Sequence, residues 1–180
     1  KQESYFYSGM LIRYLLSCLV DADRTDSMCF ETQAKYTPPA TPDWDTYISK
    51  LDIYTNSFNL NTDIAKIRDK ISKYCDMRGQ KDSKGIRTLS IPTGGGKTLS
   101  GLRYALQQAK KHNLDRVFFI IPYINIIEQN AKEIRNIFGN NVVLEHHSNV
   151  ENSNFDLSFE NWDSPIVITT MVKFMDTFFG

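Results

Sequence analysis

Residues 93–98 read Thr-Gly-Gly-Gly-Lys-Thr, and no other stretch of the chain has so clear a chemical meaning. Three successive glycines let the backbone curl so that its amide groups point at one anion. The ammonium group of Lys97 can then lie over the β- and γ-phosphates of a nucleoside triphosphate, and the Thr98 hydroxyl can take one position on Mg²⁺. The segment therefore predicts a site for ATP and Mg²⁺ in which Lys97 and Thr98 act on the reacting phosphates. The residues expected to hold the nucleotide are Thr93, Gly94, Gly95, Gly96, Lys97 and Thr98.

The segments on either side of this loop have the order that such a site requires. Residues 87–91 are short and β-prone, which predicts a strand leading into the loop. Residues 98–111 carry apolar side chains at helical spacing, which predicts a helix leaving it. This context disfavours the alternative that the loop is a glycine-rich surface turn whose lysine happens to begin a helix.

The remainder of the chain alternates predicted strands and helices. Residues 116–121 form a continuous apolar run that ends at a proline, which is typical of a parallel strand buried on both faces. Further strands are expected at 141–144 and 166–170, and helices at 124–138 and from Val172 onward. The alternation and the short connections predict an α/β fold with a doubly wound parallel sheet, in which ligands bind at the carboxyl ends of the strands.

The first thirty residues have a different character. Residues 9–22 are apolar almost all round, which predicts a helix that is buried on most sides and closed by Asp21. The run is interrupted by Arg13 and is too short to cross a membrane. Asp21, Asp23 and Asp26 follow, but the spacing excludes an EF-hand, because Asp26 and Thr32 stand where that loop needs glycine and glutamate. A metal-ligating cluster and a solvated acidic patch both remain possible at this point.

A connector separates these residues from the glycine loop. Residues 36–43 contain three prolines, which forbid a helix and favour an extended chain. Amphipathic helices are then expected at 44–58 and 62–77, followed by a polar loop at 78–85.

Composition limits the possible functions less than the motifs do. Lysine and arginine number 21, matching the 21 aspartates and glutamates, so any binding of nucleic acid must be local. Three cysteines without a CxxC spacing favour reduced thiols and a cytoplasmic protein. His146 and His147 are adjacent, and adjacent residues of a strand point to opposite faces, which favours a partly buried ring or a nucleic-acid contact over a shared zinc ion.

The glycine loop departs from the general P-loop pattern, because Ile91 stands where a glycine is usual. In this form it resembles motif I of superfamily 2 helicases, and the triple glycine resembles the CRISPR-associated helicase-nuclease of type I systems. Residues 122–129 resemble motif Ia of that family, and residues 168–170 resemble the motif that follows it. Residues 145–148 also resemble a stretch of the family. The resemblance implies an incomplete RecA-like domain in which Gln129, Thr169 and Thr170 contact single-stranded DNA.

A second resemblance lies upstream. Residues 16–24 are similar to the last conserved segment of the HD nuclease domain that precedes the helicase in the same family. The resemblance implies that Asp23 ligates a divalent transition metal, with Ser27 near the site. The family's other ligands include histidines upstream of this segment, and the three histidines here all lie at or after His112. Residues 1–180 are therefore not expected to complete that metal centre.

Together the two resemblances imply a domain order. Residues 1–30 are the C-terminal part of an HD domain, 31–60 a proline-containing linker and helix, and 61–180 the N-terminal part of the first RecA-like domain. We expect the chain to be cut at both ends and, lacking a Walker B carboxylate and a second RecA-like domain, to bind ATP without turning it over.

The family resemblance also implies a function for the whole protein. That function is an ATP-dependent 3′–5′ single-stranded DNA translocase or helicase, joined to a metal-dependent DNA nuclease acting in CRISPR interference. Its partners are single-stranded DNA and the CRISPR RNA-guided surveillance complex, with no membrane. The alternatives are another P-loop ATPase or phosphotransferase, and an inert binding module.

Overall fold

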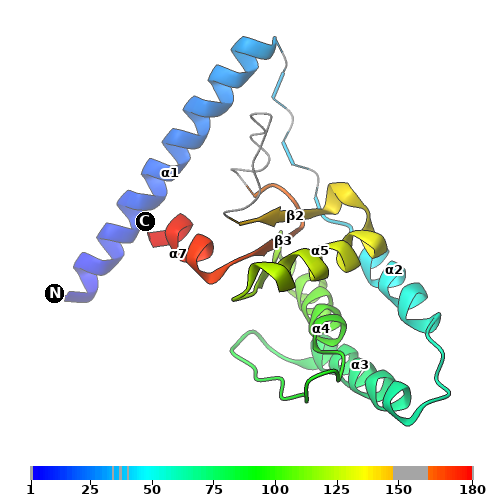
Figure 1. Ribbon diagram of the computed structural model, residues 1–180. Coiled ribbons are helices and arrows are strands. Elements are labelled where there is room, and N and C mark those ends of the chain that lie inside the picture. Colours follow the sequence, from blue (N-terminus) through cyan, green and yellow to red (C-terminus); the bar gives the residue numbers. More distant parts are fainter. Residues whose placement is uncertain (1, 34, 37, 40, 148–161, 180) are drawn as a thin grey trace. The chain divides into compact units, whose positions relative to one another are not determined.

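The computed structural model describes residues 2–33, 35, 36, 38, 39, 41–147 and 162–179 (Figure 1). Helix α1 belongs to one compact unit, and all the elements from α2 to α7 belong to another. The elements are α1 (Gln2–Thr32), α2 (Trp44–Asn56), α3 (Asp63–Lys81), α4 (Lys97–His112), β1 (Val117–Ile120), α5 (Ile124–Phe138), η1 (Asn140–Val142), β2 (Val143–His146), β3 (Ile166–Thr169) and α7 (Met171–Phe179).

The three strands form a parallel sheet in the order β1-β3-β2. Val117 and Val143 both pair with Ile166, so the three strands begin at the same level and their carboxyl ends meet at one edge. The central strand β3 has no exposed side-chain surface along its length. This sheet, with its crossover helices, confirms the α/β fold expected from the alternating pattern. It is consistent with an incomplete RecA-like domain that follows an all-α segment.

One predicted strand is absent. Residues 87–91 run extended into the glycine loop, but they form no ladder with any strand that the structure describes. Ile91 is buried, whereas Leu89 is 44% exposed and Ile86 is 97% exposed. The prediction of a strand here was wrong because β-prone residues form a strand only where a neighbouring strand pairs with their backbone groups.

The third predicted strand is displaced by two residues. Asn141 lies in the 3₁₀ turn η1, and β2 begins only at Val143 and continues to His146. The turn follows Gly139, which ends α5 with a φ of +100°. Since a short apolar run fixes the centre of a strand better than its ends, the error lies at the boundary.

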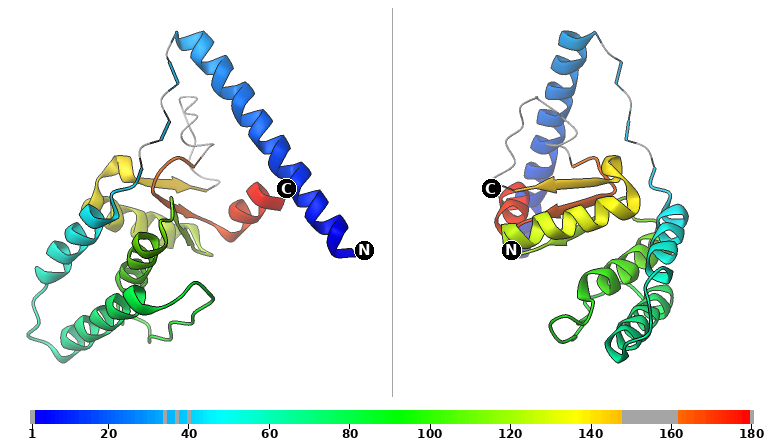
Figure 2. Two further views of the ribbon diagram at one scale, coloured as in Figure 1. Left: turned by 180° about the vertical axis from the view of Figure 1, so that it is seen from behind. Right: turned by 45° about the vertical axis from the view of Figure 1, so that its right-hand side comes forward.

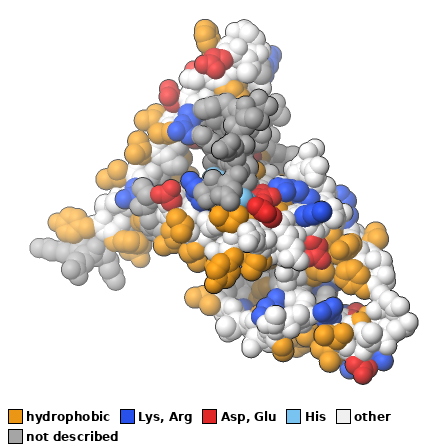
Figure 3. Space-filling model, in the orientation of Figure 1, with side chains coloured by type: hydrophobic (Ala, Val, Ile, Leu, Met, Phe, Trp, Pro, Cys, Tyr) orange, Lys and Arg blue, Asp and Glu red, His pale blue; other side chains and the backbone are white. Residues whose placement is uncertain are grey.

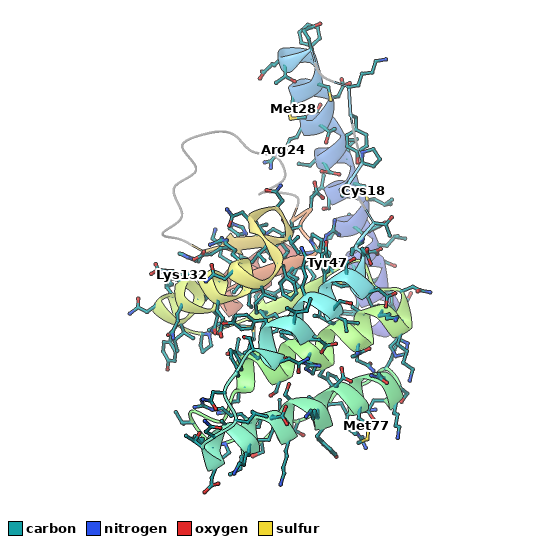
Figure 4. The ribbon with its side chains drawn as sticks, turned by 90° about the vertical axis from the view of Figure 1, so that its right-hand side faces the viewer. Cys18, Arg24, Met28, Tyr47, Met77 and Lys132 are labelled. Carbon is teal, nitrogen blue, oxygen red and sulfur yellow. The ribbon has the colours of Figure 1, made fainter. Side chains whose placement is uncertain are left out.

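The core lies between the sheet and helices α2, α4 and α5. Helix α5 lies along the sheet (Figures 1 and 2) and contributes a fully buried stripe of side chains to the core, which includes Ile127 and Ile134. Helix α2 contributes Leu51 and Trp44 to the core, and Nε1 of Trp44 donates to the carbonyl of Leu114 at 2.8 Å. The ring of Tyr47 points from α2 into the packed side chains (Figure 4) and meets the ring of Phe138 edge-on. Helix α2 therefore packs with the elements that carry the glycine loop.

Helices α3 and α4 approach each other closely at Gly79. A Cβ atom at this position would lie 2.7 Å from Cβ of Gln107 and 2.9 Å from the carbonyl oxygen of Tyr104. Only glycine permits this spacing, and it lets the last turn of α3 pack against the middle of α4. The helix predicted at 62–77 thus extends to Lys81, and only the second part of the predicted polar loop at 78–85 remains non-helical.

Helix α1 differs from its prediction in length and in burial. It is one continuous helix over 31 residues, so Asp21 does not close it and the acidic run lies on its surface. No glycine or proline follows Gly9 within it to stop the helix. Its apolar side chains are exposed, among them Leu19 at 67%, and Figure 3 shows hydrophobic side chains along its length. Burial on most sides was wrong for this helix, because an apolar surface is buried only where other elements cover it.

The helices of the described residues differ from membrane-spanning helices in length or in hydropathy. None of them is both long enough and apolar enough to span a membrane.

Candidate functional site

The glycine loop is shaped by conformations that only glycine adopts easily. Gly94 and Gly96 have φ angles of +79° and +82°. Gly95 fits for another reason, because a Cβ atom there would lie 2.3 Å from Cγ2 of Ile91. Each of the three glycines is therefore required by the path of the chain.

One backbone amide departs from the expectation that all the loop amides face an anion. The amide of Gly95 donates to the carbonyl of Pro92 at 3.0 Å and so closes a turn within the loop. The donors that stay available are at the start of α4, where Gly96 is the N-cap and its carbonyl accepts from Ser100 at 3.1 Å. These free amides and the positive end of the helix dipole make an anion site at the point where Lys97 begins the helix.

A hollow of about 580 Å³ surrounds this helix start, and we call it the loop hollow. Its walls are the glycine loop, the first turn of α4, Phe58 and Arg68 on one side, and Gln129 and Glu133 of α5 on the other. The structure thus brings together the predicted residues Thr93, Gly94, Gly96, Lys97 and Thr98. Sequence reasoning missed Phe58, Arg68 and Glu133, since they come from segments without a recognisable motif.

The hydroxyl of Thr98 has a defined orientation. Its Oγ1 donates to Oδ1 of Asn130 at 3.1 Å, across the gap between α4 and α5. Asn130 is itself buried. Because the hydroxyl proton is used in this contact, the oxygen lone pairs remain for a hard cation, as a ligand to Mg²⁺ requires. The donor set therefore fits the predicted metal, and Asn130 is a partner that the sequence did not indicate.

The acidic group in the loop hollow is Glu133. Burial, together with the nearby Glu133 carboxylate, raises the pKa of Tyr54 on α2. A carboxylate and the cations of Arg68 and Lys97 thus line one hollow. The cations suit the phosphates of a nucleotide, and the carboxylate suits a hard cation such as Mg²⁺.

A second, smaller hollow of about 220 Å³ adjoins the first, and we call it the side hollow. It shares Phe58, Arg68, Gly96 and Leu99 with the loop hollow and continues between Leu60, Ala65 and Ser72 of the α2–α3 region. The Oγ atom of Ser72 is buried and has no hydrogen-bond partner in the part of the chain that the structure describes. The site therefore has a polar, charged part at the loop and a more apolar extension beside it.

The segment that enters the loop is anchored at Asp82. This carboxylate accepts from the Tyr104 hydroxyl at 3.2 Å and forms ion pairs with Arg78 at 2.8 Å and Arg87 at 3.4 Å. Burial alone would raise the pKa of Asp82, but the hydrogen bond from Tyr104 and the two arginines outweigh it, so the pKa is lowered. Side chains, rather than a strand ladder, hold residues 82–87 in place.

The expected DNA contacts fall in different places. Gln129 is exposed and lines the loop hollow, whose walls include neither Thr169 nor Thr170. Thr169 is fully buried and its hydroxyl donates to the carbonyl of His146 at 2.8 Å, so its side chain has no surface to offer a strand. Thr170 is half-buried at the carboxyl end of β3, where its Oγ1 accepts from the amide of Lys173 at 3.1 Å and caps α7.

The histidines at the end of β2 include one buried ring. Nε2 of His147 lies 2.9 Å from a carboxylate oxygen of Glu145, whose other oxygen accepts from Arg135 at 2.7 Å. His147 is 3% exposed. The group links α5 to the end of the sheet, and the ring of His147 is more fully buried than the partly buried ring that was expected. The residue expected beside it in the family stretch, Ser148, lies outside the described residues.

Asp23 lies on the surface of α1, and Ser27 lies one turn further along the same helix. Within the described ranges, no three histidine, cysteine, aspartate or glutamate side chains converge as a metal shell would. Asp23 by itself supplies one possible ligand, so no reaction step can be derived from this helix.

Comparison with protein families adds one finding. The model of the family described as type III restriction enzyme, res subunit, matches residues 59–178. The match begins after α2, covers α3, the whole glycine loop and the sheet, and ends within α7. No curated protein matches the chain.

Proposed function

Because the chain belongs to the family of type III restriction enzyme res subunits, a helicase-related group, we propose that residues 59–178 are the ATP-binding part of a motor that moves along single-stranded DNA. The main support for this proposal is the loop hollow. It combines glycines at positive φ, a helix N-terminus, Lys97 and an oriented Thr98 hydroxyl within one cavity. This set of groups suits a triphosphate with its metal ion.

Each residue has a role in this proposal. The free amides at the start of α4 and the ammonium of Lys97 hold the phosphates, while the Thr98 oxygen holds Mg²⁺ with Asn130 fixing its direction. The side hollow lies next to the phosphate-binding groups, and we propose that it takes the nucleoside. Hydrolysis of the bound triphosphate supplies the free energy for movement along the strand.

The contacts to DNA belong to the carboxyl ends of the strands. Thr170 caps α7 there, where backbone amides and a hydroxyl can contact phosphates without reading sequence. We keep Gln129 as a proposed contact from α5, and the burial of Thr169 limits that residue to supporting the strand end. Movement in the 3′–5′ direction is part of the proposal.

For the whole protein we propose the CRISPR-associated helicase-nuclease described above, acting in the cytoplasm with the RNA-guided surveillance complex as partner. This rests on the triple glycine and on the similarity of residues 16–24 to an HD nuclease segment. In this proposal Asp23 gives one carboxylate to a divalent transition metal, and the remaining ligands come from outside residues 1–180. A hard carboxylate suits an ion that must bind and acidify water.

The first experiment is Lys97→Ala in the full-length protein. We expect loss of DNA-stimulated ATP hydrolysis by about two orders of magnitude or more, since the charge on the transferred phosphate loses its cation. Metal-dependent nicking of single-stranded DNA should persist. ATP hydrolysis that needs no DNA would favour another P-loop ATPase, and unchanged hydrolysis in the variant would remove Lys97 from the site.

The second experiment is Asp23→Ala, with Asp26→Ala as a control on the same exposed face of α1. We expect the Asp23 variant to lose nicking and keep DNA-stimulated ATP hydrolysis, whereas the Asp26 variant keeps both. Normal nicking by the Asp23 variant would exclude this residue from the metal shell.

A further inference from the structure

Arg68 contacts the glycine loop although it lies on α3, well before the motif. Its Nε donates to the carbonyl oxygen of Gly94 at 2.7 Å. Its aliphatic stem lies beside Gly96, with Cγ 3.6 Å from the position that a Cβ atom would take there. One side chain thus touches both glycines of the loop that have positive φ, Gly94 and Gly96.

The contact fixes a particular peptide group. The carbonyl of Gly94 and the amide of Gly95 belong to the same peptide unit, and the amide end is held by the carbonyl of Pro92 at 3.0 Å. Arg68 holds the other end. Because glycine adopts either sign of φ at little cost, a peptide between two glycines can rotate when its ends are free. The two hydrogen bonds select one orientation.

The orientation matters for an anion in the loop hollow. A carbonyl oxygen that turned into the hollow would place partial negative charge against the phosphates, where the site otherwise offers amides, Lys97 and a helix N-terminus. With Arg68 in place, the oxygen of Gly94 is engaged on the α3 side. Among the residues that the structure describes, Arg68 forms no ion pair, so no carboxylate competes for this guanidinium.

We propose that Arg68 is a positioning residue of the nucleotide site, which keeps the Gly94 carbonyl turned away from the phosphates. The inference rests on the proposed ATP site. It makes the geometry of the glycine loop depend on a residue of α3, a helix that precedes the loop in the sequence. Arg68 acts through the loop, so the effect of removing it should be the same for every nucleotide that uses the loop.

The test measures binding of ADP and of a non-hydrolysable ATP analogue to the full-length protein carrying Arg68→Ala. Loss of a charged hydrogen bond predicts a dissociation constant roughly tenfold higher for both nucleotides. The KM for ATP should rise by a similar factor and kcat should fall by less. Because Arg68 is exposed, the melting temperature without nucleotide should stay unchanged while the rise on adding nucleotide shrinks.

Two further variants separate positioning from charge. Arg68→Lys keeps the positive charge but has no Nε at the required place, so it should bind nucleotide as weakly as the alanine variant. Recovery of wild-type affinity by lysine, or a loss confined to the ATP analogue, would show a direct phosphate contact and overturn the proposal. Lys70→Ala, which removes an exposed cation from the same helix, should leave the affinity unchanged.

Lys97→Ala completes the design. If it weakens binding and Arg68→Ala does not, the positioning role is wrong and the ATP site stands. If neither variant weakens binding, the proposed ATP site itself is wrong.

Discussion

Residues 87–91 and residues 166–169 both fall in predicted strands, but only the second segment is a strand. Both are short and β-prone, and both precede a turn that begins a helix. Segment 166–169 lies between β1 and β2 and is fully buried. Segment 87–91 pairs with no strand in the described chain, and its position depends on side chains around Asp82. The difference teaches that the pattern predicts a capacity to form a strand, whereas the neighbours decide whether one forms.

The largest effect that tests this contrast should come from Ile168→Ala in β3. Ile168 is fully buried at the centre of the sheet, so the truncation should lower the free energy of unfolding by about 2–5 kcal/mol. Leu89→Ala is the matched change in the other segment and should alter this free energy by only about 0.5 kcal/mol, because Leu89 is exposed rather than buried in the core. Chemical denaturation measures both. Equal costs would mean that 87–91 is packed as a strand in solution.

A smaller effect should follow from Gly95→Ala, which tests how tightly segment 87–91 meets the loop. The new methyl group would lie 2.3 Å from Cγ2 of Ile91, and relieving this overlap should cost about 1–3 kcal/mol of stability and weaken nucleotide binding. Gly101→Ala is the control. It has open space around its Cβ position within α4 and should gain up to about 1 kcal/mol. An unchanged Gly95→Ala protein would show that Ile91 moves freely.

The smallest effect is the loss of folding stability at acidic pH. The pKa of Asp82 is lower in the folded chain than its ordinary value of 3.8, so the unfolded chain binds more protons as the pH falls through this value. Stability from Asp82 is therefore present above about pH 4 and is lost below it. Melting temperatures between pH 2.5 and pH 6 should fall less steeply for Asp82→Asn than for the wild type. Asp63→Asn, at an exposed position, should keep the wild-type slope, and a wild-type slope in Asp82→Asn would rule out this anchor.

The sequence was sufficient where one local signal decides the structure. Helical spacing predicted α4 and α5, and the apolar runs predicted β1 and β3. The sequence also predicted the glycine loop and the first turn of α4 after it. Glycine alone allows the positive φ angles of the loop, and the free amides at a helix start need no partner from a distant segment.

Contacts between distant segments could not be predicted. The partners of the loop, Arg68 and Asn130, lie 26 and 32 residues from the groups that they bind, and nothing in their local sequence marks them. The same limit explains α1, whose apolar surface predicted burial without indicating what would cover it. The pairing that residues 87–91 lack is a third case of the same kind.

Gly79 links the contact between α3 and α4 to the glycine loop, because the same helix carries Arg68. It lies 11 residues, or about 16 Å along the helix, from Arg68. A bulkier residue at position 79 would push α3 away from α4 and so shift the helix that carries Arg68. A methyl group at position 79 would therefore disturb the hydrogen bond between Arg68 and the Gly94 carbonyl without touching the glycine loop. The shape of the loop thus depends on the absence of a side chain about three helical turns away from Arg68.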